Sequence, residues 1–218
     1  MPEPITLVTV GSGLIGLTFH LARRYFEMAK EVVDVVLGFM LLLAALPVLL
    51  LCAVLIKLSS RGPVFYVQAR VGKGGEIFNM YKLRTMRSDA EIDTGAVWAA
   101  KDDPRIIPGC RWMRHSHVDE LPQLINVIKG QMSLVGPRPE RPGILAELEK
   151  VYPDVRRRLT VRPGITGLSQ VRNGYDTSVG SFRRKLAADL EYIEKRRWSQ
   201  ELRILMATVP RLSDKQAN

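Results

Sequence analysis

The longest apolar stretch of this chain runs from Val35 to Ile56, where 22 consecutive residues carry no charge. A straight helix of that length measures about 33 Å and could cross the core of a bilayer. Pro47 lies near its middle, where a proline removes a helix hydrogen bond and bends the chain. Basic residues flank the stretch on both sides, and a spanning helix would have to export one flank. We therefore expect residues 29–60 to form a re-entrant membrane hairpin broken at Pro47, in preference to a straight span or a buried helix of a soluble protein.

The residues before this stretch, 1–28, form a weakly apolar leader. Gly11, Gly13 and Gly16 make a GxGxxG motif after a short apolar run, the pattern of a dinucleotide-binding turn. Asp34, which lies where a ribose-binding acid is needed, opens the apolar stretch instead of ending a second strand. The spacing of small residues also fits a helix that packs closely or lies in lipid. A membrane-tethered nucleotide-binding oxidoreductase is therefore an alternative that the sequence context disfavours.

Two stretches after the membrane segment have the composition of β-strands. Residues 62–72 are rich in aromatic and β-branched side chains, and residues 77–86 alternate between polar and apolar positions. In the second stretch Lys82 and Arg84 stand two residues apart, so a strand places both on one face. Two cations on a strand face are either solvated or grip a diphosphate, and the spacing leaves both readings open.

A short amphipathic helix is predicted just after residue 120. Its apolar positions recur at i, i+3, i+4 and i+7 and are Leu121, Leu124, Ile125 and Ile128. Pro122 fits only the first turn of a helix, and Gly130 is suited to ending one. Asp119 and Glu120 therefore lie at or just before the helix N-terminus, where unpaired N–H groups favour anions and lower the pKa of carboxylates.

Two arginines downstream are restricted by neighbouring prolines. Arg138 lies between two prolines, and Arg162 precedes one. A restricted arginine loses less freedom when its planar fork binds phosphate. Together with the Asp119–Glu120 pair, these arginines indicate a magnesium and phosphate site. The other reading, in which the two carboxylates only cap the helix, is equally open from these residues.

The C-terminal third of the chain is predicted to be helical. Residues 143–155 read as a polar helix, and residues 181–198 as a charged helix with a narrow apolar side. A further amphipathic helix follows Trp198, and its apolar face consists of Leu202, Leu205, Met206 and Val209. Such a basic helix either lies on an anionic membrane surface or packs on the protein core, and both readings are open. The elements together predict a helix-rich α+β fold.

The chain has a formal net charge of +10 and a pI near 9.9. This excess predicts an anionic partner: a nucleotide, a lipid head group or nucleic acid. Cys52 and Cys110 occur in unrelated sequence contexts with no CxxC pair, which suits a reducing compartment and indicates neither a disulfide framework nor a zinc site. His115 and His117 have no third metal-type ligand nearby, so we expect surface or substrate-facing histidines.

From about Ala29 to Leu212 the sequence resembles a known family, the bacterial sugar transferases that are monotopic phosphoglycosyl transferases. The matches occur in one order along the chain. They are the proline-broken membrane segment, Gly62-Pro-Val-Phe, Gln68-x-Arg70, Tyr81-Lys-Leu-Arg-Thr-Met86, Asp103-Pro-Arg-Ile106, Asp119-Glu-Leu-Pro-Gln123, Asn126-Val-Ile-Lys-Gly130, Met132-Ser-Leu-Val-Gly-Pro-Arg-Pro139 and Val161-Arg-Pro-Gly-Ile-Thr-Gly167.

The resemblance implies transfer of a sugar phosphate from a UDP-sugar to a polyprenyl phosphate such as undecaprenyl phosphate, with release of UMP. It implies that Asp119 is a nucleophile that forms an aspartyl phosphosugar, that Mg²⁺ is required, and that Glu120 assists metal binding or proton handling. It marks Arg138 as a phosphate-binding residue. Further candidates for substrate binding are Lys82, Arg84, Arg162 and Gln123. Many relatives carry Ser or Thr where this chain has His117.

The resemblance also implies a division of the chain into three parts. Residues 1–28 form the leader, residues 29–60 the re-entrant membrane hairpin, and residues 61–218 a small α/β catalytic domain with interfacial amphipathic helices. The implied location is the cytoplasmic face of a bacterial inner membrane, without a nucleic acid partner, and a homodimer is left open. The remaining alternative is a membrane-attached adaptor without catalysis, against which the paired carboxylates and restricted arginines argue.

Overall fold

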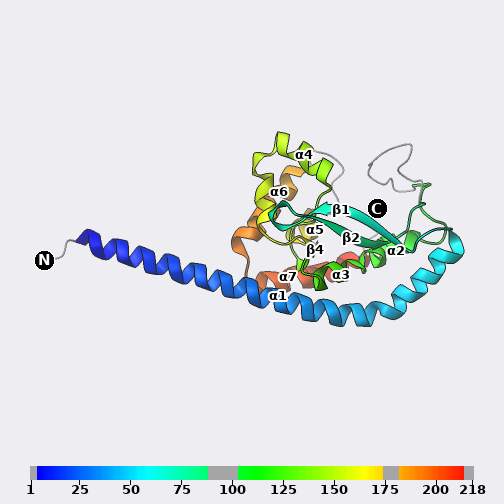
Figure 1. The fold of residues 1–218 in the computed structure, drawn as a ribbon, viewed down its shortest axis with the longest axis horizontal. Helices are drawn as coiled ribbons and strands as arrows, with labels where there is room; N and C mark the ends of the chain where they lie inside the picture. Colours follow the sequence, from blue (N-terminus) through cyan, green and yellow to red (C-terminus); the bar gives the residue numbers. More distant parts are fainter. Residues whose placement is uncertain (1–3, 88–102, 174–181, 214–218) are drawn as a thin grey trace.

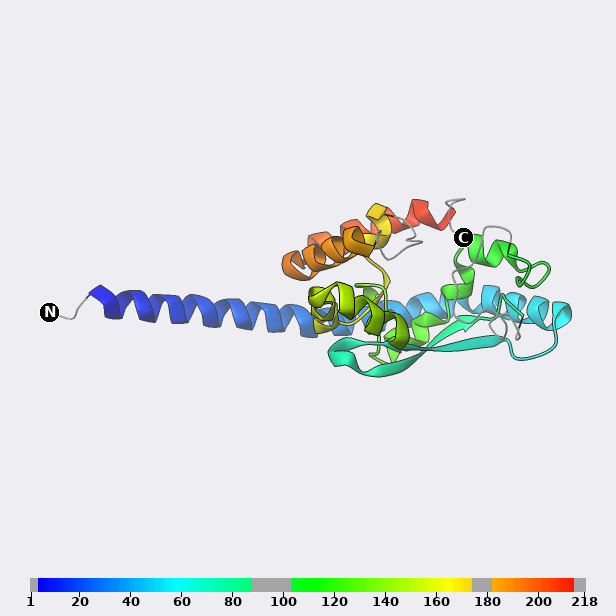
Figure 2. The same cartoon turned by 90° about the horizontal axis from the view of Figure 1, so that it is seen from above.

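A computed structural model describes the backbone of residues 4–87, 103–173 and 182–213. Its longest element is α1, one α-helix from Pro4 to Ser59 (Figure 1 and Figure 2). Pro47 lies inside this helix without interrupting it, and α1 curves toward its C-terminal end, in the light-blue to cyan part of Figure 1. The expected break at Pro47 is therefore a bend within a continuous helix. No interruption of α1 marks the boundary expected at residue 28.

The GxGxxG motif lies within the same helix. A dinucleotide-binding turn needs a strand before the motif and a helix after it. Because the backbone is helical on both sides of the motif, the oxidoreductase alternative is wrong.

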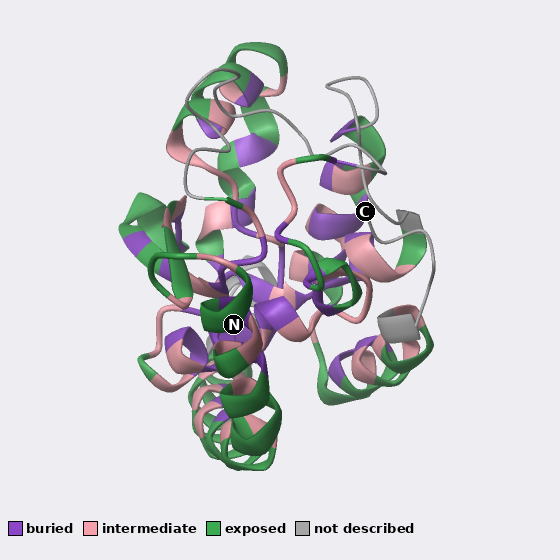
Figure 3. Ribbon diagram, turned by 90° about the vertical axis from the view of Figure 1, so that its right-hand side faces the viewer, coloured by how far each residue is buried: buried purple, intermediate pink, exposed green. Residues whose placement is uncertain are grey.

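One face of α1 packs against the rest of the molecule, on both sides of Pro47. Its buried residues recur at helical spacing and include Lys30, Asp34, Gly38, Cys52 and Ile56. The remaining surface of the helix is apolar and exposed, as at Phe39, Leu43 and Leu50. Figure 3 looks along α1 and shows its exposed residues on the side that faces away from the other elements. Within the described part of the chain, α1 is the one helix long and apolar enough to cross a membrane.

Two strands form an antiparallel hairpin, β1 (Phe65–Val71) and β2 (Ile77–Leu83), joined through the 3-10 turn η1 (Lys73–Gly75). Tyr66 pairs with Lys82 across the hairpin. Both predicted extended stretches are thus confirmed. Lys82 lies within β2, whereas Arg84 lies just beyond its end.

The region of the predicted central helix is divided into short elements, which are α2 (Arg111–His115), η2 (Val118–Glu120), α3 (Gln123–Ile128) and β3 (Ser133–Val135). Pro122 is the residue just before α3, and Gly130 has a φ of +71°, which ends the helical segment. Asp119 and Glu120 lie in η2, directly before α3, as predicted.

The remaining elements complete a helix-rich α+β fold, and they are α4 (Pro142–Val151), η3 (Pro153–Thr160), β4 (Gly164–Thr166), α5 (Leu168–Asn173), α6 (Phe182–Lys195), α7 (Trp198–Thr208) and η4 (Val209–Ser213). Strands β3 and β4 pair in parallel. Helix α7 turns Ile204 into the core and leaves Trp198, Leu202 and Met206 exposed. Its predicted apolar face is therefore mostly exposed, while another side of the helix packs on the core.

A buried polar network fixes α1 to the other elements. Lys30 Nζ lies 3.2 Å from Asp34 Oδ2 and 2.8 Å from Glu201 Oε2 of α7. The Ser133 hydroxyl donates to Asp34 Oδ2 at 2.7 Å, and the Tyr192 hydroxyl of α6 donates to Glu201 Oε1 at 2.7 Å. All five residues are buried. The network therefore joins α1, α6, α7 and β3 at one point.

The two cysteines lie in one apolar cluster. Cys52 of α1 and Cys110, just before α2, are both buried and free, and they pack with Ile107 and Met113. Their sequence contexts are unrelated, but the fold brings both residues into one cluster. The cluster fixes the C-terminal part of α1 beside α2.

Candidate active site

Three elements bring four charged side chains together: Lys82 from β2, Asp119 and Glu120 from η2, and Arg138 from the turn after β3. Lys82 Nζ donates to Glu120 Oε1 at 2.6 Å. Arg138 donates to the same oxygen through Nη2 at 2.6 Å and to Glu120 Oε2 through Nη1 at 3.1 Å. This bidentate pair fixes both Glu120 and Arg138. Of the two readings open for Lys82, solvation on the strand face is therefore wrong.

The turn that carries Arg138 is held by close backbone packing. Gly164 N donates to Pro137 O at 3.0 Å. A Cβ atom on Gly136 would lie 2.5 Å from Arg162 O, so only glycine permits this approach of the two chain segments. The Gly-Pro-Arg-Pro sequence thus combines a glycine needed for packing with prolines that restrict Arg138.

The pKa values of Asp119 and Glu120 are shifted in opposite directions. Burial alone would raise the pKa of Glu120, but Arg138 and Lys82 outweigh it and hold this pKa well below its ordinary range. Burial raises the pKa of Asp119 to about 6, against the opposing attraction of Lys82. The expected lowering is therefore confirmed for Glu120, where ion pairs cause it. It is wrong for Asp119, because desolvation outweighs the dipole of short helical segments.

The carboxylate of Asp119 has no hydrogen bond or ion pair with any residue that the structure describes. Its side chain is nevertheless buried, and Lys82, Arg114 and Arg138 all favour its charged form. Glu120, in contrast, has both oxygens engaged by cations and caps no helix N-terminus. The capping reading is therefore wrong, and Asp119 is the carboxylate available to a ligand or a reacting atom.

His117 lies beside this cluster with a φ of +55°, in the left-handed region. Burial lowers the pKa of His117, and the attraction of Glu120 only partly opposes this effect, since Arg138 and Lys82 repel the imidazolium. A neutral imidazole is therefore expected at pH 7. The side chain is half-buried, and a substrate-facing role for His117 stays a prediction.

Two other predicted arginines lie away from the carboxylate pair. Arg84 donates through Nη2 and Nη1 to two backbone carbonyl oxygens just after α1, at 3.0 and 2.8 Å. Arg162 forms an ion pair of 2.9 Å with Glu31 of α1. Gln123 is fully buried on α3, and neither polar atom of its side-chain amide has a hydrogen-bond partner among the described residues. Substrate binding by these residues stays a prediction.

Arg70 of β1 is a cation near the site that sequence reasoning did not select. Its Nη1 donates to Pro139 O at 2.8 Å, and its Nε donates to Gln68 Oε1 at 3.0 Å. The signal was present in the sequence, since Gln68 and Arg70 stand two residues apart in an extended stretch. Nothing in the spacing, however, showed that their face meets the Pro-Arg-Pro turn.

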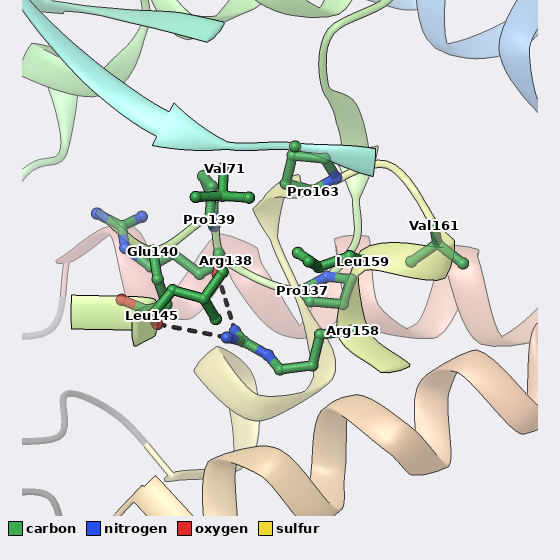
Figure 4. A pocket seen from close by; sticks show the side chains of 11 residues that line it. Val71, Pro137, Arg138, Pro139, Glu140, Leu145, Arg158, Leu159, Val161 and Pro163 are labelled. Carbon is green, nitrogen blue, oxygen red and sulfur yellow. Dashed lines mark hydrogen bonds and ion pairs between the residues drawn. The ribbon is translucent and has the colours of Figure 1, made fainter. Parts of the chain in front are cut away.

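A small pocket lies against the same turn (Figure 4), and its apolar walls are Val71, Pro137, Leu145, Leu159, Val161 and Pro163. Arg158 reaches across it, donating to Arg138 O at 2.8 Å and lying 3.6 Å from Glu140 Oε1. A contact of 2.8 Å with Asp189 of α6 anchors its guanidinium. Arg158, which sequence reasoning also missed, thus supports the backbone of the turn from inside the fold.

Comparison with known proteins identifies the family that carries this cluster. The family model described as "Bacterial sugar transferase" matches residues 25–215. The chain belongs to this family. The transferase resembles a UDP-glucose:undecaprenyl-phosphate glucose-1-phosphate transferase of Caulobacter vibrioides, with 41% identity over 196 residues that cover 88% of this chain and 72% of the relative.

Other relatives of the transferase differ in length and in the sugar that their names give. A UDP-glucose:undecaprenyl-phosphate glucose-1-phosphate transferase of Xanthomonas campestris is 40% identical over 193 residues, covering 87% of this chain and 40% of the relative. A putative undecaprenyl-phosphate N-acetylgalactosaminyl 1-phosphate transferase of Bacillus subtilis is 47% identical over 136 residues, covering 62% of this chain and 75% of the relative. The names share the lipid phosphate and differ in the sugar.

The carboxylates of the site could hold Mg²⁺ only together with oxygen ligands from a bound substrate. No group of three or more His, Cys, Asp or Glu side chains that could hold a metal ion occurs in the described ranges. Mg²⁺ is usually bound by one or two carboxylates together with phosphate oxygens and water. Asp119 offers such a carboxylate, whereas the Glu120 oxygens are engaged by cations. A magnesium ion here would be shared between Asp119 and substrate phosphates.

Proposed function

We propose that this transferase moves a sugar 1-phosphate from a UDP-sugar to undecaprenyl phosphate, or a related polyprenyl phosphate, and releases UMP. The names of its relatives support this reaction class. The observation that carries the proposal is the state of Asp119. It is a buried carboxylate without a bonded partner among the described residues, set among Lys82, Arg114 and Arg138.

In the first step, an Asp119 oxygen attacks the phosphorus that bears the sugar. The bond from this phosphorus to the bridging oxygen breaks, and the bridging oxygen leaves on UMP. Asp119 becomes an aspartyl phosphosugar, while Lys82 and Arg138 offset negative charge at the site. Mg²⁺ bound at Asp119 and the diphosphate would supply further charge neutralisation.

In the second step, an oxygen of the lipid phosphate attacks the same phosphorus, and the Asp119 carboxylate leaves. UMP departs before the lipid enters, so two bulky substrates use one position in turn. A phosphate oxygen is already deprotonated near neutral pH and needs no general base. Glu120, with both oxygens bound, acts in this scheme by orienting Lys82 and Arg138.

We also place the enzyme on the cytoplasmic face of the inner membrane. One face of α1 packs against the catalytic elements both before and after Pro47, so a perpendicular span would draw these elements into the bilayer. The outer face of α1 and the exposed residues Trp198, Leu202 and Met206 of α7 are apolar surfaces that a membrane would cover.

The test is a single-turnover experiment without a lipid acceptor. Purified wild type, given labelled UDP-glucose or UDP-N-acetylgalactosamine and Mg²⁺, should release at most about one UMP per enzyme and retain the sugar phosphate. Asp119→Asn should release none, since an amide is a very poor nucleophile. Glu120→Gln, the matched control, should still become labelled because the nucleophile is intact. Its labelling should be slow because Lys82 and Arg138 lose the carboxylate that orients them.

The opposite result is as clear. If wild type releases UMP only when polyprenyl phosphate is present, and no labelled enzyme can be trapped, transfer is direct. Asp119 would then act only as a metal ligand.

A further inference from the structure

Arg70 is a cation without an acidic partner. No Asp or Glu lies within ion-pair distance of it in the part of the chain that the structure describes, and its hydrogen bonds go to neutral oxygens of Gln68 and Pro139. Burial and the neighbouring charge of Arg138 lower the pKa of Arg70 to about 10, so it remains protonated at neutral pH. Lys82 and Arg138, in contrast, both share the carboxylate of Glu120.

The position of Arg70 is determined by a row of polar side chains on β1. Tyr66, Gln68 and Arg70 alternate along the strand and therefore share one face. Gln68 Nε2 donates to the Tyr66 hydroxyl at 3.0 Å, and Gln68 Oε1 accepts from Arg70 Nε and Nη2. The row begins opposite Lys82 and ends at Pro139, so it runs beside the carboxylate pair.

A partly buried guanidinium next to another cation is unfavourable unless an anion offsets its charge. The Pro139 carbonyl and the Gln68 amide orient Arg70 but supply no negative charge. Glu140 and Glu120 attract Arg70 from beyond ion-pair distance, but burial and Arg138 outweigh them. An anionic ligand at this place would therefore gain both a preorganised fork and an incompletely compensated charge. The anions that the proposed reaction brings here are phosphates.

We propose that Arg70, oriented by Gln68, binds a substrate phosphate that is not bonded to Asp119, namely the phosphate of the leaving UMP. This inference rests on the proposed function. When the bond between the sugar-bearing phosphorus and the bridging oxygen breaks, negative charge grows on the UMP phosphate. Arg70 stabilises this charge and keeps its own proton. The phosphate of the lipid acceptor has the same chemistry, so the experiment separates the two sources.

The experiment compares Arg70→Met, Arg70→Lys and Gln68→Leu with wild type and with Arg156→Met, which removes an exposed arginine of η3. Three quantities are measured on each full-length protein in detergent: the dissociation constant of UMP by calorimetry with Mg²⁺, the rate of the UMP burst, and the rate at which pre-labelled enzyme transfers to polyprenyl phosphate. Thermal unfolding of each variant checks that it is folded.

We expect Arg70→Met to bind UMP about 10- to 100-fold more weakly, the loss typical of a charge-assisted hydrogen bond. Its UMP burst should slow while lipid transfer from labelled enzyme stays at the wild-type rate. Arg70→Lys should recover part of the affinity, and Gln68→Leu should weaken UMP binding with little change in melting temperature. Arg156→Met should behave as wild type.

Three results would overturn the assignment. Slower lipid transfer with unchanged UMP binding and burst would make Arg70 a residue for the lipid phosphate. Unchanged values of all three quantities in folded variants would leave Arg70 as a structural clamp between β1 and Pro139, and so would the absence of UMP binding by wild type. If wild type binds UMP through Arg70 but releases none from UDP-sugars, the proposed function fails while the nucleotide site stands.

Discussion

Asp119 has a pKa raised to about 6 because its carboxylate is buried. In the proposed mechanism only the ionised form attacks phosphorus, so the rate of the UMP burst should rise with pH and level off above about pH 7, and Mg²⁺ bound at Asp119 should move this rise below pH 6. Glu120 is expected to stay ionised throughout, since Arg138 and Lys82 outweigh its burial and hold its pKa well below the ordinary range. Burst rates measured from acid to neutral pH check this, and the apparent pKa belongs to the coupled pair. A rate that does not change across this range would contradict it.

The same burial makes ionised Asp119 unfavourable for stability. Its pKa is higher in the folded state than the ordinary 3.8, so the cost is fully present above about pH 6 and is absent below pH 3.8. A rise from 3.8 to about 6 corresponds to about 3 kcal/mol of free energy. Asp119→Asn should therefore raise the free energy of unfolding by about 1–3 kcal/mol at pH 8 and leave it unchanged near pH 4.

Denaturant unfolding without Mg²⁺, in one detergent and at both pH values, measures this difference. Asp154→Asn is the matched control, because the Asp154 side chain is 68% exposed. Equal stability of wild type and Asp119→Asn at pH 8 would show that the burial of Asp119 carries no cost.

Sequence reasoning found the residues whose role follows from contiguous motifs. Asp119, Glu120 and Arg138 were selected in this way, and the structure brings them together. Arg70 and Arg158 were missed because their positions follow from packing: one strand face meets a turn, and η3 is anchored on α6. The pKa direction of Asp119 failed for a related reason, since a local rule about helix ends carries no information on burial.

At the scale of elements, the sequence predicted the apolar helix α1 but not its continuity through Pro47. The uncharged stretch correctly predicted an apolar helix that is long enough to cross a membrane. Pro47 predicted a break, but the packing on either side of a proline decides whether a helix breaks or bends. Gly38 lies close to Val127 on one side of Pro47, and Cys52 packs with Ile107, Cys110 and Met113 on the other. These contacts hold both halves of α1 in one curved helix.

The polar network at Lys30 is expected to stabilise the attachment of α1. Lys30→Met would leave Asp34 and Glu201 buried without a cation, and breaking a buried pair in this way typically costs about 3–5 kcal/mol. The free energy of unfolding in detergent measures the loss. The triple change Lys30→Met, Asp34→Asn and Glu201→Gln should recover part of it, because no unpaired charge remains. Lys195→Met, at a side chain that is 66% exposed, is the control. A loss no larger than that of the control would contradict the role of the network.

At the scale of the whole molecule, two helices with exposed apolar side chains, α1 and α7, contact each other. The Phe26 ring of α1 and the Trp198 ring of α7 lie in edge contact, with 5.2 Å between their centroids. The exposed row of α7 therefore begins beside α1 at Phe26. The net charge of +10 adds attraction to an anionic lipid surface. One side of the molecule is thus suited to lipid, and the cluster of Lys82, Asp119, Glu120 and Arg138 lies on elements that pack against the other face of α1.

This arrangement predicts that both ends of the apolar stretch face the cytoplasm. Single cysteines would replace Arg24, Leu46 and Lys57, all exposed on α1, in a variant in which Cys52 and Cys110 are alanine. A membrane-impermeant maleimide should label positions 24 and 57 in inverted vesicles and neither in intact cells, while position 46 stays protected by lipid. A cysteine at Arg156 of η3 reports the side of the catalytic elements. Labelling of positions 24 and 57 from opposite sides would establish a spanning helix and contradict the one-sided attachment.

Pro47→Leu, which restores an unbroken helix hydrogen-bond ladder, should shift part of the population toward that spanning pattern.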